Sequence, residues 1–138
     1  MNRICQASRL LWLMIFMPLC FADAAVNDTL HTPAMQVPQA QHAVLLDLAR
    51  AGERLVAVGE RGIVMLSDDN GLSWRQAKVP ISASLTTVQF VDAKHGWAGG
   101  HAGVVLASQD GGEHWTVQLD GHKAAQLELD AARQQAGD

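Results

Sequence analysis

Short apolar runs alternate with turn-forming Gly, Asp and Asn residues from position 44 to position 119. Runs of this length, rich in Val, Ile, Leu and Trp and bounded by turn residues, are typical of β-strands. We expect eight strands in two sets of four. The expected ranges are 44–50, 54–59, 63–67 and 73–79 in the first set, and 85–91, 97–100, 104–108 and 114–119 in the second. The pattern predicts an all-β fold.

The pattern changes after Gly121, where residues 122–138 are rich in Ala, Gln, Leu and Glu. Ala124, Leu127 and Ala131 fall on one helical stripe, so this tail is expected to form an α-helix of about three to four turns. Residues 25–43 are polar and small, contain two prolines and show no periodicity. They are expected to form an extended or flexible lead-in.

Residues 1–24 have the three parts of a secretory signal peptide. A short positive stretch is followed by the apolar run 10–21, and Ala22-Asp23-Ala24 has the small-x-small pattern of a cleavage site. The apolar run is well short of the roughly 20 residues that a membrane-spanning helix needs. We therefore expect an exported protein whose mature chain has no membrane span. Both cysteines, Cys5 and Cys20, lie in this leader, so no disulfide or thiolate site is expected in the mature chain.

The two sets of strands are copies of each other at an offset of 41 residues. Seven identities fall within sixteen positions when the chain is compared with itself at this offset. The matching residues are Gly59 and Gly100, Gly62 and Gly103, Val64 and Val105, Ser67 and Ser108, Asp69 and Asp110, Gly71 and Gly112, and Trp74 and Trp115. Repeats of about 40–45 residues with four strands each are typical of β-propeller blades. The repeat predicts two four-stranded blades, at 44–79 and 85–119, within residues 44–121.

Each repeat contains Ser-x-Asp-x-Gly-x-x-Trp, written SDDNGLSW and SQDGGEHW in the two copies. The carboxylate can accept hydrogen bonds from the amides of the turn that it begins, and the glycine can adopt the positive φ of a tight hairpin. The serine can bind the same turn, and the indole can cover it. We expect these residues to be structural: Ser67, Asp69, Gly71, Trp74, Ser108, Asp110, Gly112 and Trp115. Replacing either tryptophan by alanine is expected to cost about 3–5 kcal/mol of stability.

Calcium binding and catalysis are the alternative roles for these aspartates. Neither copy has the alternating acidic ligands and the terminal bidentate glutamate of an EF-hand-type loop. Catalysis requires two unlike groups, whereas the same groups recur here at the same place in each repeat. The six histidines show no metal-binding spacing, and no phosphate or dinucleotide loop is present. No metal, cofactor or catalytic residue is therefore expected.

The charge balance argues against a nucleic-acid partner. The chain has 10 Lys and Arg against 14 Asp and Glu. Two arginines and one aspartate belong to the leader, so the mature chain has 8 basic and 13 acidic side chains. A net negative chain without a basic cluster repels phosphate backbones.

The two motifs resemble the Asp-box, or bacterial neuraminidase repeat. The longer frame GERGIVMLSDDNGLSW and GGHAGVVLASQDGGEHW resembles the photosystem II assembly and stability factor family over residues 44–121. The resemblance implies a β-propeller exported to a periplasm or thylakoid lumen. It also implies a non-enzymatic assembly factor that holds a membrane-protein precursor. The alternative is a truncated relative of Asp-box glycoside hydrolases, but sialidases use a tyrosine nucleophile and this chain has no tyrosine.

A binding role would use the loops on one face of the blades. Arg61 projects from the turn 59–62, and we expect His101 to hold the matching place in the second repeat, so both are candidate partner contacts. Trp97 is expected to fill the interface between neighbouring blades. Two blades cannot close a ring, because each blade hides its face against a neighbour. The sequence therefore favours either a truncated gene product or a homo-oligomer of about three or four copies.

Overall fold

The computed structural model describes residues 28–136, so the expected signal peptide lies outside the described residues. Eight strands, three turns of 3-10 helix and one α-helix occur in this part of the chain. In chain order they are η1 (Ala40–His42), β1 (Leu45–Ala51), β2 (Arg54–Gly59), η2 (Glu60–Gly62), β3 (Val64–Ser67), β4 (Arg75–Gln76), β5 (Leu85–Phe90), β6 (Gly96–Gly100), η3 (His101–Gly103), β7 (Val105–Ser108), β8 (Thr116–Leu119) and α1 (Gly121–Ala136).

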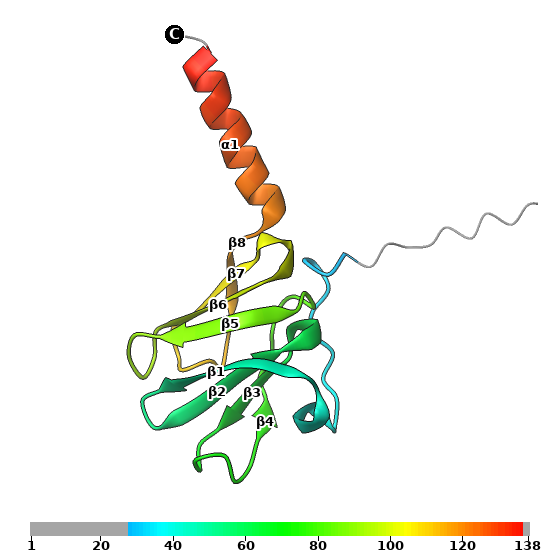
Figure 1. The fold of residues 1–138 in the computed structure, drawn as a ribbon, viewed down its shortest axis with the longest axis vertical. Coiled ribbons are helices and arrows are strands. Elements are labelled where there is room, and N and C mark those ends of the chain that lie inside the picture. The colour runs from blue at the N-terminus through cyan, green and yellow to red at the C-terminus, as the bar shows by residue number, and fades with distance from the viewer. Residues whose placement is uncertain (1–27, 137–138) are drawn as a thin grey trace, which may run out of the picture.

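The strands form two antiparallel four-stranded sheets, in the orders β1-β2-β3-β4 and β5-β6-β7-β8. One sheet lies above the other in Figure 1. The expected all-β class with two four-stranded blades is therefore confirmed, and we call β1–β4 the first blade and β5–β8 the second blade. β4 is shorter than the expected strand 73–79, because Ser73 and Trp74 belong to the preceding turn.

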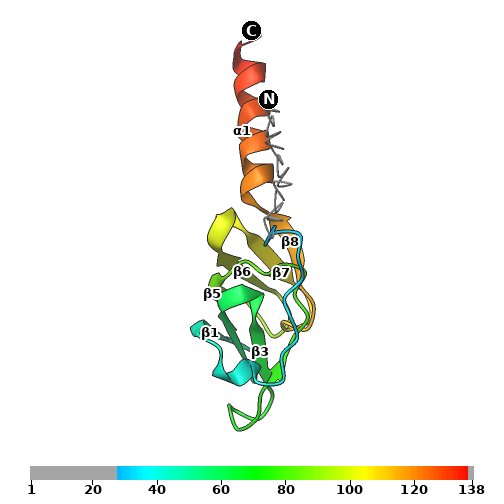
Figure 2. The same ribbon diagram turned by 90° about the vertical axis from the view of Figure 1, so that its right-hand side faces the viewer.

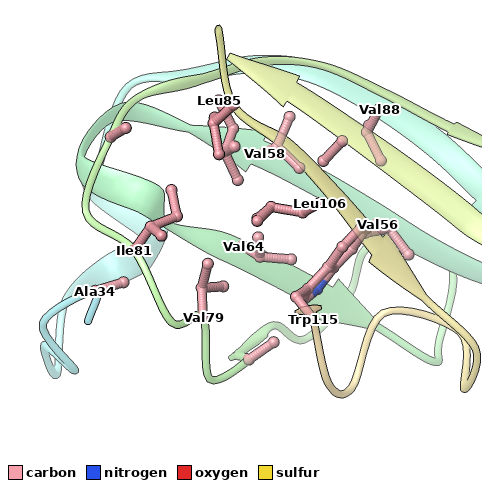
Figure 3. Packing of buried hydrophobic residues seen from close by; sticks show 14 of the residues in the cluster. Ala34, Val56, Val58, Val64, Val79, Ile81, Leu85, Val88, Leu106 and Trp115 are labelled. Atoms are coloured by element: carbon pink, nitrogen blue, oxygen red, sulfur yellow. The ribbon is translucent and has the colours of Figure 1, made fainter. Parts of the chain in front are cut away.

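The main core lies between the two blades. Val56, Val58, Val64 and Leu66 of the first blade belong to the same buried cluster as Leu106 and Trp115 of the second. Strand side chains alternate between the two faces of a sheet, so these four residues share one face of the first blade. The segment between the blades contributes Val79, Ile81 and Ala83 to the same cluster (Figure 3).

The lead-in lies along the blades and is anchored to them. The N–H of Ala34 donates to the carbonyl of Val79 over 3.0 Å, and the N–H of Ser82 donates to the carbonyl of Thr29 over 2.8 Å. Ala40 is buried with Ala57, Ile63 and Met65, on the face of the first blade that points away from the second. This part of the lead-in therefore covers an apolar face that would otherwise meet water.

Helix α1 stands away from the blades (Figures 1 and 2). The side chain of Asp120 accepts a hydrogen bond from the N–H of Lys123 over 2.8 Å and so caps the helix. None of the residues of α1 is buried, so the stripe of Ala124, Leu127 and Ala131 covers neither blade. Within residues 28–136, no helix has the length and apolar character needed to cross a membrane.

Candidate functional site

The first Asp-box forms a closed set of hydrogen bonds in the turn between β3 and β4. The Ser67 hydroxyl donates to Asp69 Oδ1 over 2.8 Å and accepts the N–H of Gly71 over 2.8 Å. Asp69 also accepts the N–H and the hydroxyl of Ser73, over 2.8 and 2.5 Å. The indole N–H of Trp74 donates to the carbonyl of Gly71 over 3.1 Å. Every polar group of the motif therefore binds within its own turn.

The second Asp-box repeats this geometry between β7 and β8. Ser108 donates to Asp110 over 3.0 Å and accepts the N–H of Gly112 over 2.9 Å. Asp110 accepts the N–H of His114 over 3.0 Å, and its second oxygen lies 2.7 Å from the imidazole Nδ1 of the same residue. The indole N–H of Trp115 donates to the carbonyl of Gly112 over 2.9 Å. His114 thus stands where Ser73 stands in the first copy.

The two turns use positive φ at the motif glycines, with φ of 92° at Gly71 and 88° at Gly112. This conformation is open to glycine and strained for other residues. The two indoles differ in burial. Trp115 is 4% exposed and meets Phe90 edge to face at 6.1 Å between ring centroids, whereas Trp74 is only half-buried. The second motif is therefore part of the main core, and the first lies at its edge.

The hydrogen bonds lower the pKa of both motif aspartates. The Ser73 hydroxyl, followed by the Ser73 N–H and the Ser67 hydroxyl, lowers the pKa of Asp69 from 3.8 to about 2. Burial acts to raise the pKa of Asp110, but the N–H and the imidazole of His114 outweigh it and lower that pKa. Both carboxylates are thus held ionised as hydrogen-bond acceptors, which is opposite to the raised pKa that a general acid needs.

Acid should weaken the first turn. Because the folded pKa of Asp69 lies below its ordinary value, its ionisation stabilises the fold fully above pH 3.8, and this contribution disappears as the pH falls toward about 2. We expect the urea midpoint of the wild type to drop over this window, and the drop to be smaller in Asp69→Asn. Chemical unfolding followed from pH 7 to pH 2 measures both, with Asp130→Asn on exposed α1 as the control. Equal pH profiles for wild type and Asp69→Asn would contradict this account.

Four charged side chains join the two blades, and the sequence analysis did not single them out as a set. Arg54 on β2 binds Asp68 at 2.5 Å and Glu113 at 3.0 Å. Arg75 on β4 forms a two-pronged ion pair with Glu113, one prong at 2.7 Å, and also reaches Asp68 at 3.3 Å. Arg54 further donates to the carbonyl of Gly111 over 3.2 Å. The hydrogen bond from Arg75 is the main cause of the lowered pKa of Glu113. This ion network holds the second Asp-box against the first blade.

Arg61 lies at the rim of the blades, in η2. Its side chain is exposed, and its N–H donates to the hydroxyl of Ser84 over 3.3 Å. The expected pairing with His101 is wrong by one position. At the offset of 41 residues, Arg61 corresponds to Ala102, and the two share a left-handed backbone with φ of 54° and 58°. His101 corresponds to Glu60 and does not join Arg61 in one site.

Arg61 borders a groove of about 690 Å³ between η2 and the lead-in. The apolar part of its wall consists of Pro33, Met35, Val37, Ala43 and Ile63. Glu60, His42 and Gln39 supply further polar groups. The sequence analysis missed this groove, because its wall depends on the lead-in lying beside η2. The surface combines an apolar trough with one guanidinium at its edge.

Trp97 does not fill an interface between the two blades. Its side chain is 45% exposed on β6. Its partners across the sheet are Gln89 and Ala107, whereas the core between the blades contains its neighbour Ala98. Trp97 therefore lies on the face of the second blade that points away from the first. Among residues 28–136, no group of three His, Cys, Asp or Glu side chains is placed to hold a metal ion.

Comparisons with known proteins agree with the repeat. The family described as photosynthesis system II assembly factor YCF48 matches residues 72–135. The chain is 29% identical over 107 residues to the chloroplastic photosystem II stability/assembly factor HCF136 of Cyanidioschyzon merolae, covering 70% of this chain and 24% of the relative. It is 32% identical over 71 residues to the photosystem II assembly protein Ycf48 of Synechococcus sp., covering 47% of this chain and 21% of the relative.

A solved structure of YCF48 bound to D1 peptide is similar in fold, with a TM-score of 0.52 and 25% sequence identity. The match covers 62% of this chain and 29% of that structure. The chain thus spans about a quarter of the length of the curated relatives that it matches. Two Asp-box blades, the matched family and the similar fold lead to one assignment. The chain belongs, through these repeats, to the family of photosystem II stability and assembly factors.

Proposed function

We propose that this chain is an exported, non-catalytic protein-binding module of the assembly-factor type. Its partner would be a protein, in the manner of a membrane-protein complex or its precursor. The observation that carries the proposal is the groove beside Arg61, where an apolar trough ends at an exposed guanidinium. Residues 1–24 have the pattern of a leader, which supports a location in a periplasm or, in a photosynthetic cell, a thylakoid lumen.

The groove has the chemistry of a site for an extended peptide. Met35 and Val37 of the lead-in supply apolar wall on one side, and Ile63 supplies it near η2. An apolar peptide side chain would gain from burial there. A guanidinium presents planar paired donors that match a carboxylate, so Arg61 would select a segment with an acidic side chain or a free carboxyl terminus. The rigid blades beneath hold η2 in place, which keeps the loss of conformational entropy on binding small.

The relatives support a protein partner rather than a small substrate. HCF136 and Ycf48 are named for the stability or assembly of photosystem II, and the solved YCF48 structure contains a bound D1 peptide. The family match begins at Leu72 and therefore includes the second Asp-box but not the groove. The assembly role thus rests on the relatives, and the position of the peptide rests on the groove.

A non-catalytic role agrees with the state of the Asp-box carboxylates. Asp69 and Asp110 accept hydrogen bonds within their own turns and have lowered pKa values. Glu113, which lies beside the second motif, is paired with Arg75 and Arg54. None of these carboxylates is arranged as the acid of an acid–nucleophile pair. The glycoside hydrolase alternative therefore requires residues other than the motifs that suggested it.

Peptide binding tests the proposal directly. We expect a fluorescent D1 peptide, or a short apolar peptide with one carboxylate, to bind the purified chain. Arg61→Ala should weaken that binding by about tenfold or more, because a hydrogen bond to a charged group contributes about 1.5–3 kcal/mol. Fluorescence anisotropy measures the change. Arg133→Ala on exposed α1 removes the same charge away from the groove and serves as the control.

Two results would contradict the proposal. Equal affinities of wild type, Arg61→Ala and Arg133→Ala would remove Arg61 from the binding site. Hydrolysis of sialosides or aryl glycosides that survives repurification, and that is lost in Asp110→Asn with the fold intact, would instead support the glycoside hydrolase alternative. A non-catalytic role predicts no such turnover, and Asp110→Asn would then lower only stability.

A further inference from the structure

The contact between the two blades shows which faces of this repeat fit each other. The front face of a blade is defined here as the one that meets the following blade, and it consists of Val56, Val58, Val64 and Leu66 in the first blade. The back face is the one that meets the preceding blade. In the second blade it consists of Leu85, Val88, Ala98, Val104, Leu106 and Trp115. All of these residues belong to one buried cluster.

The front face of the second blade has no cover within residues 28–136. At the offset of 41 residues, its members are Trp97, Gly99, Val105 and Ala107. Trp97 is 45% exposed, whereas its counterpart Val56 is fully buried, and the other three are only partly buried. Helix α1 buries no residue against this face. An indole and two aliphatic side chains therefore form an apolar surface that meets water.

The back face of the first blade is covered on one side only. The lead-in buries Ala57, Ile63 and Met65, which correspond to Ala98, Val104 and Leu106. The part on β1 remains open. Leu48 is 54% exposed, although its counterpart Val88, which has the same pairing position on β5, is buried. Leu46, Leu48, Ala57 and Trp74 line a shallow hollow there.

The charges of these two faces also agree. The ion network between the blades needs Arg54 and Arg75 on the front face and Glu113 on the back face. Their counterparts on the uncovered faces carry no formal charge at neutral pH. His95 and Thr116 replace the two arginines, and Leu72 replaces the glutamate and is 89% exposed. Bringing the two faces together would therefore bury no unpaired charge at these positions.

We propose that the front face of the second blade binds the open back face of the first blade in a second copy of this chain. In the contact between the blades, Val56 and Leu66 lie over Gly112, where an added Cβ would come within 3.4 and 3.2 Å of them. The same arrangement between copies brings Trp97 over Gly71 and Trp74, whose surroundings leave more room. The lead-in stays in place, and the hollow beside β1 receives the indole.

This contact joins two different surfaces, so it is head to tail and can add further copies. The unlike surfaces give the test its design. A charge at Trp97 should block one surface, and a charge at Leu48 should block the other. We expect the wild-type chain to sediment as species larger than a monomer, in a concentration-dependent manner. Trp97→Glu and Leu48→Glu should each sediment as a monomer.

Mixing the two variants is the decisive measurement. Each variant keeps the surface that the other lacks, so an equimolar mixture should form a one-to-one dimer that grows no further. Leu129→Glu, at an apolar residue of α1 with nearly the same exposure as Trp97, is the control and should assemble like the wild type. Circular dichroism establishes that each variant is folded. Analytical ultracentrifugation measures all five samples.

Three outcomes would overturn the inference. A folded wild-type chain that stays monomeric through the micromolar range excludes self-association through these faces. Loss of assembly in Trp97→Glu but not in Leu48→Glu, with no dimer in the mixture, indicates a symmetric contact through Trp97 alone. Loss of assembly in Leu129→Glu assigns the contact to α1. Peptide binding at Arg61 involves neither face, so the proposed function stands or falls separately.

Discussion

Replacing Trp115 by alanine is expected to lower the free energy of unfolding by about 3–5 kcal/mol. The indole is 4% exposed, contacts Phe90 edge to face, and lies in the core shared by both blades. Its removal would leave a cavity between the blades and release the carbonyl of Gly112 from its hydrogen bond. In a small domain such a loss is a large fraction of the total stability. Urea unfolding followed by circular dichroism measures the effect.

Trp74→Ala is the matched control, because Trp74 has the same position and hydrogen bond in the first Asp-box. Its ring is only half-buried, so we expect a loss of about 1–2 kcal/mol, from the smaller buried area. The sequence alone predicted equal losses for the two tryptophans. Equal losses in experiment, or a larger loss for Trp74→Ala, would contradict the difference in burial described above.

Gly62→Ala is expected to destabilise the fold by about 3 kcal/mol or more, the sum of backbone strain and overlap. Gly62 has φ of 71°, and an added Cβ would lie 2.2 Å from the carbonyl oxygen of Ile81. Ile81 is fully buried in the core, so this backbone has little room to move. Thermal unfolding of the purified variant provides the measurement.

Gly103→Ala separates the two causes, since Gly103 is the repeat counterpart of Gly62 and has φ of 66°. The nearest atoms to its added Cβ lie 3.4 Å away, at Gly121. Only the cost of the left-handed backbone remains there, about 1–2 kcal/mol. If the two variants lose the same stability, the close approach of Ile81 has no energetic effect.

Local patterns were sufficient to predict the strands and the turns. The offset of 41 residues aligned the strands of one blade with those of the other, and seven of the eight expected strands differ from the observed ones by at most two residues at either end. The Asp-box bonds join residues at most four positions apart. Interactions over such short separations depend little on the rest of the chain, so the sequence specifies them directly.

The lead-in and the segment between the blades were harder to predict. Apolar residues alternate at Ala77, Val79, Ile81, Ala83 and Leu85, and this period of two was the available signal for burial. Prolines and small polar residues around these positions indicated loops instead. The burial of Ala34 and Ala40 had no periodic signal, because it depends on which surfaces the blades leave open.

The sequence by itself determined the two four-stranded repeats, their Asp-box turns and the helical tail, because periodicity and turn chemistry act between neighbouring residues. Only the tertiary structure decided which tryptophan is buried, that Arg61 borders a groove, that Arg54, Arg75, Asp68 and Glu113 form one network, and that Trp97 faces outward. These features join residues far apart in the chain. They depend on how one blade packs against the other and on where the lead-in lies, and no local pattern in the sequence encodes that packing.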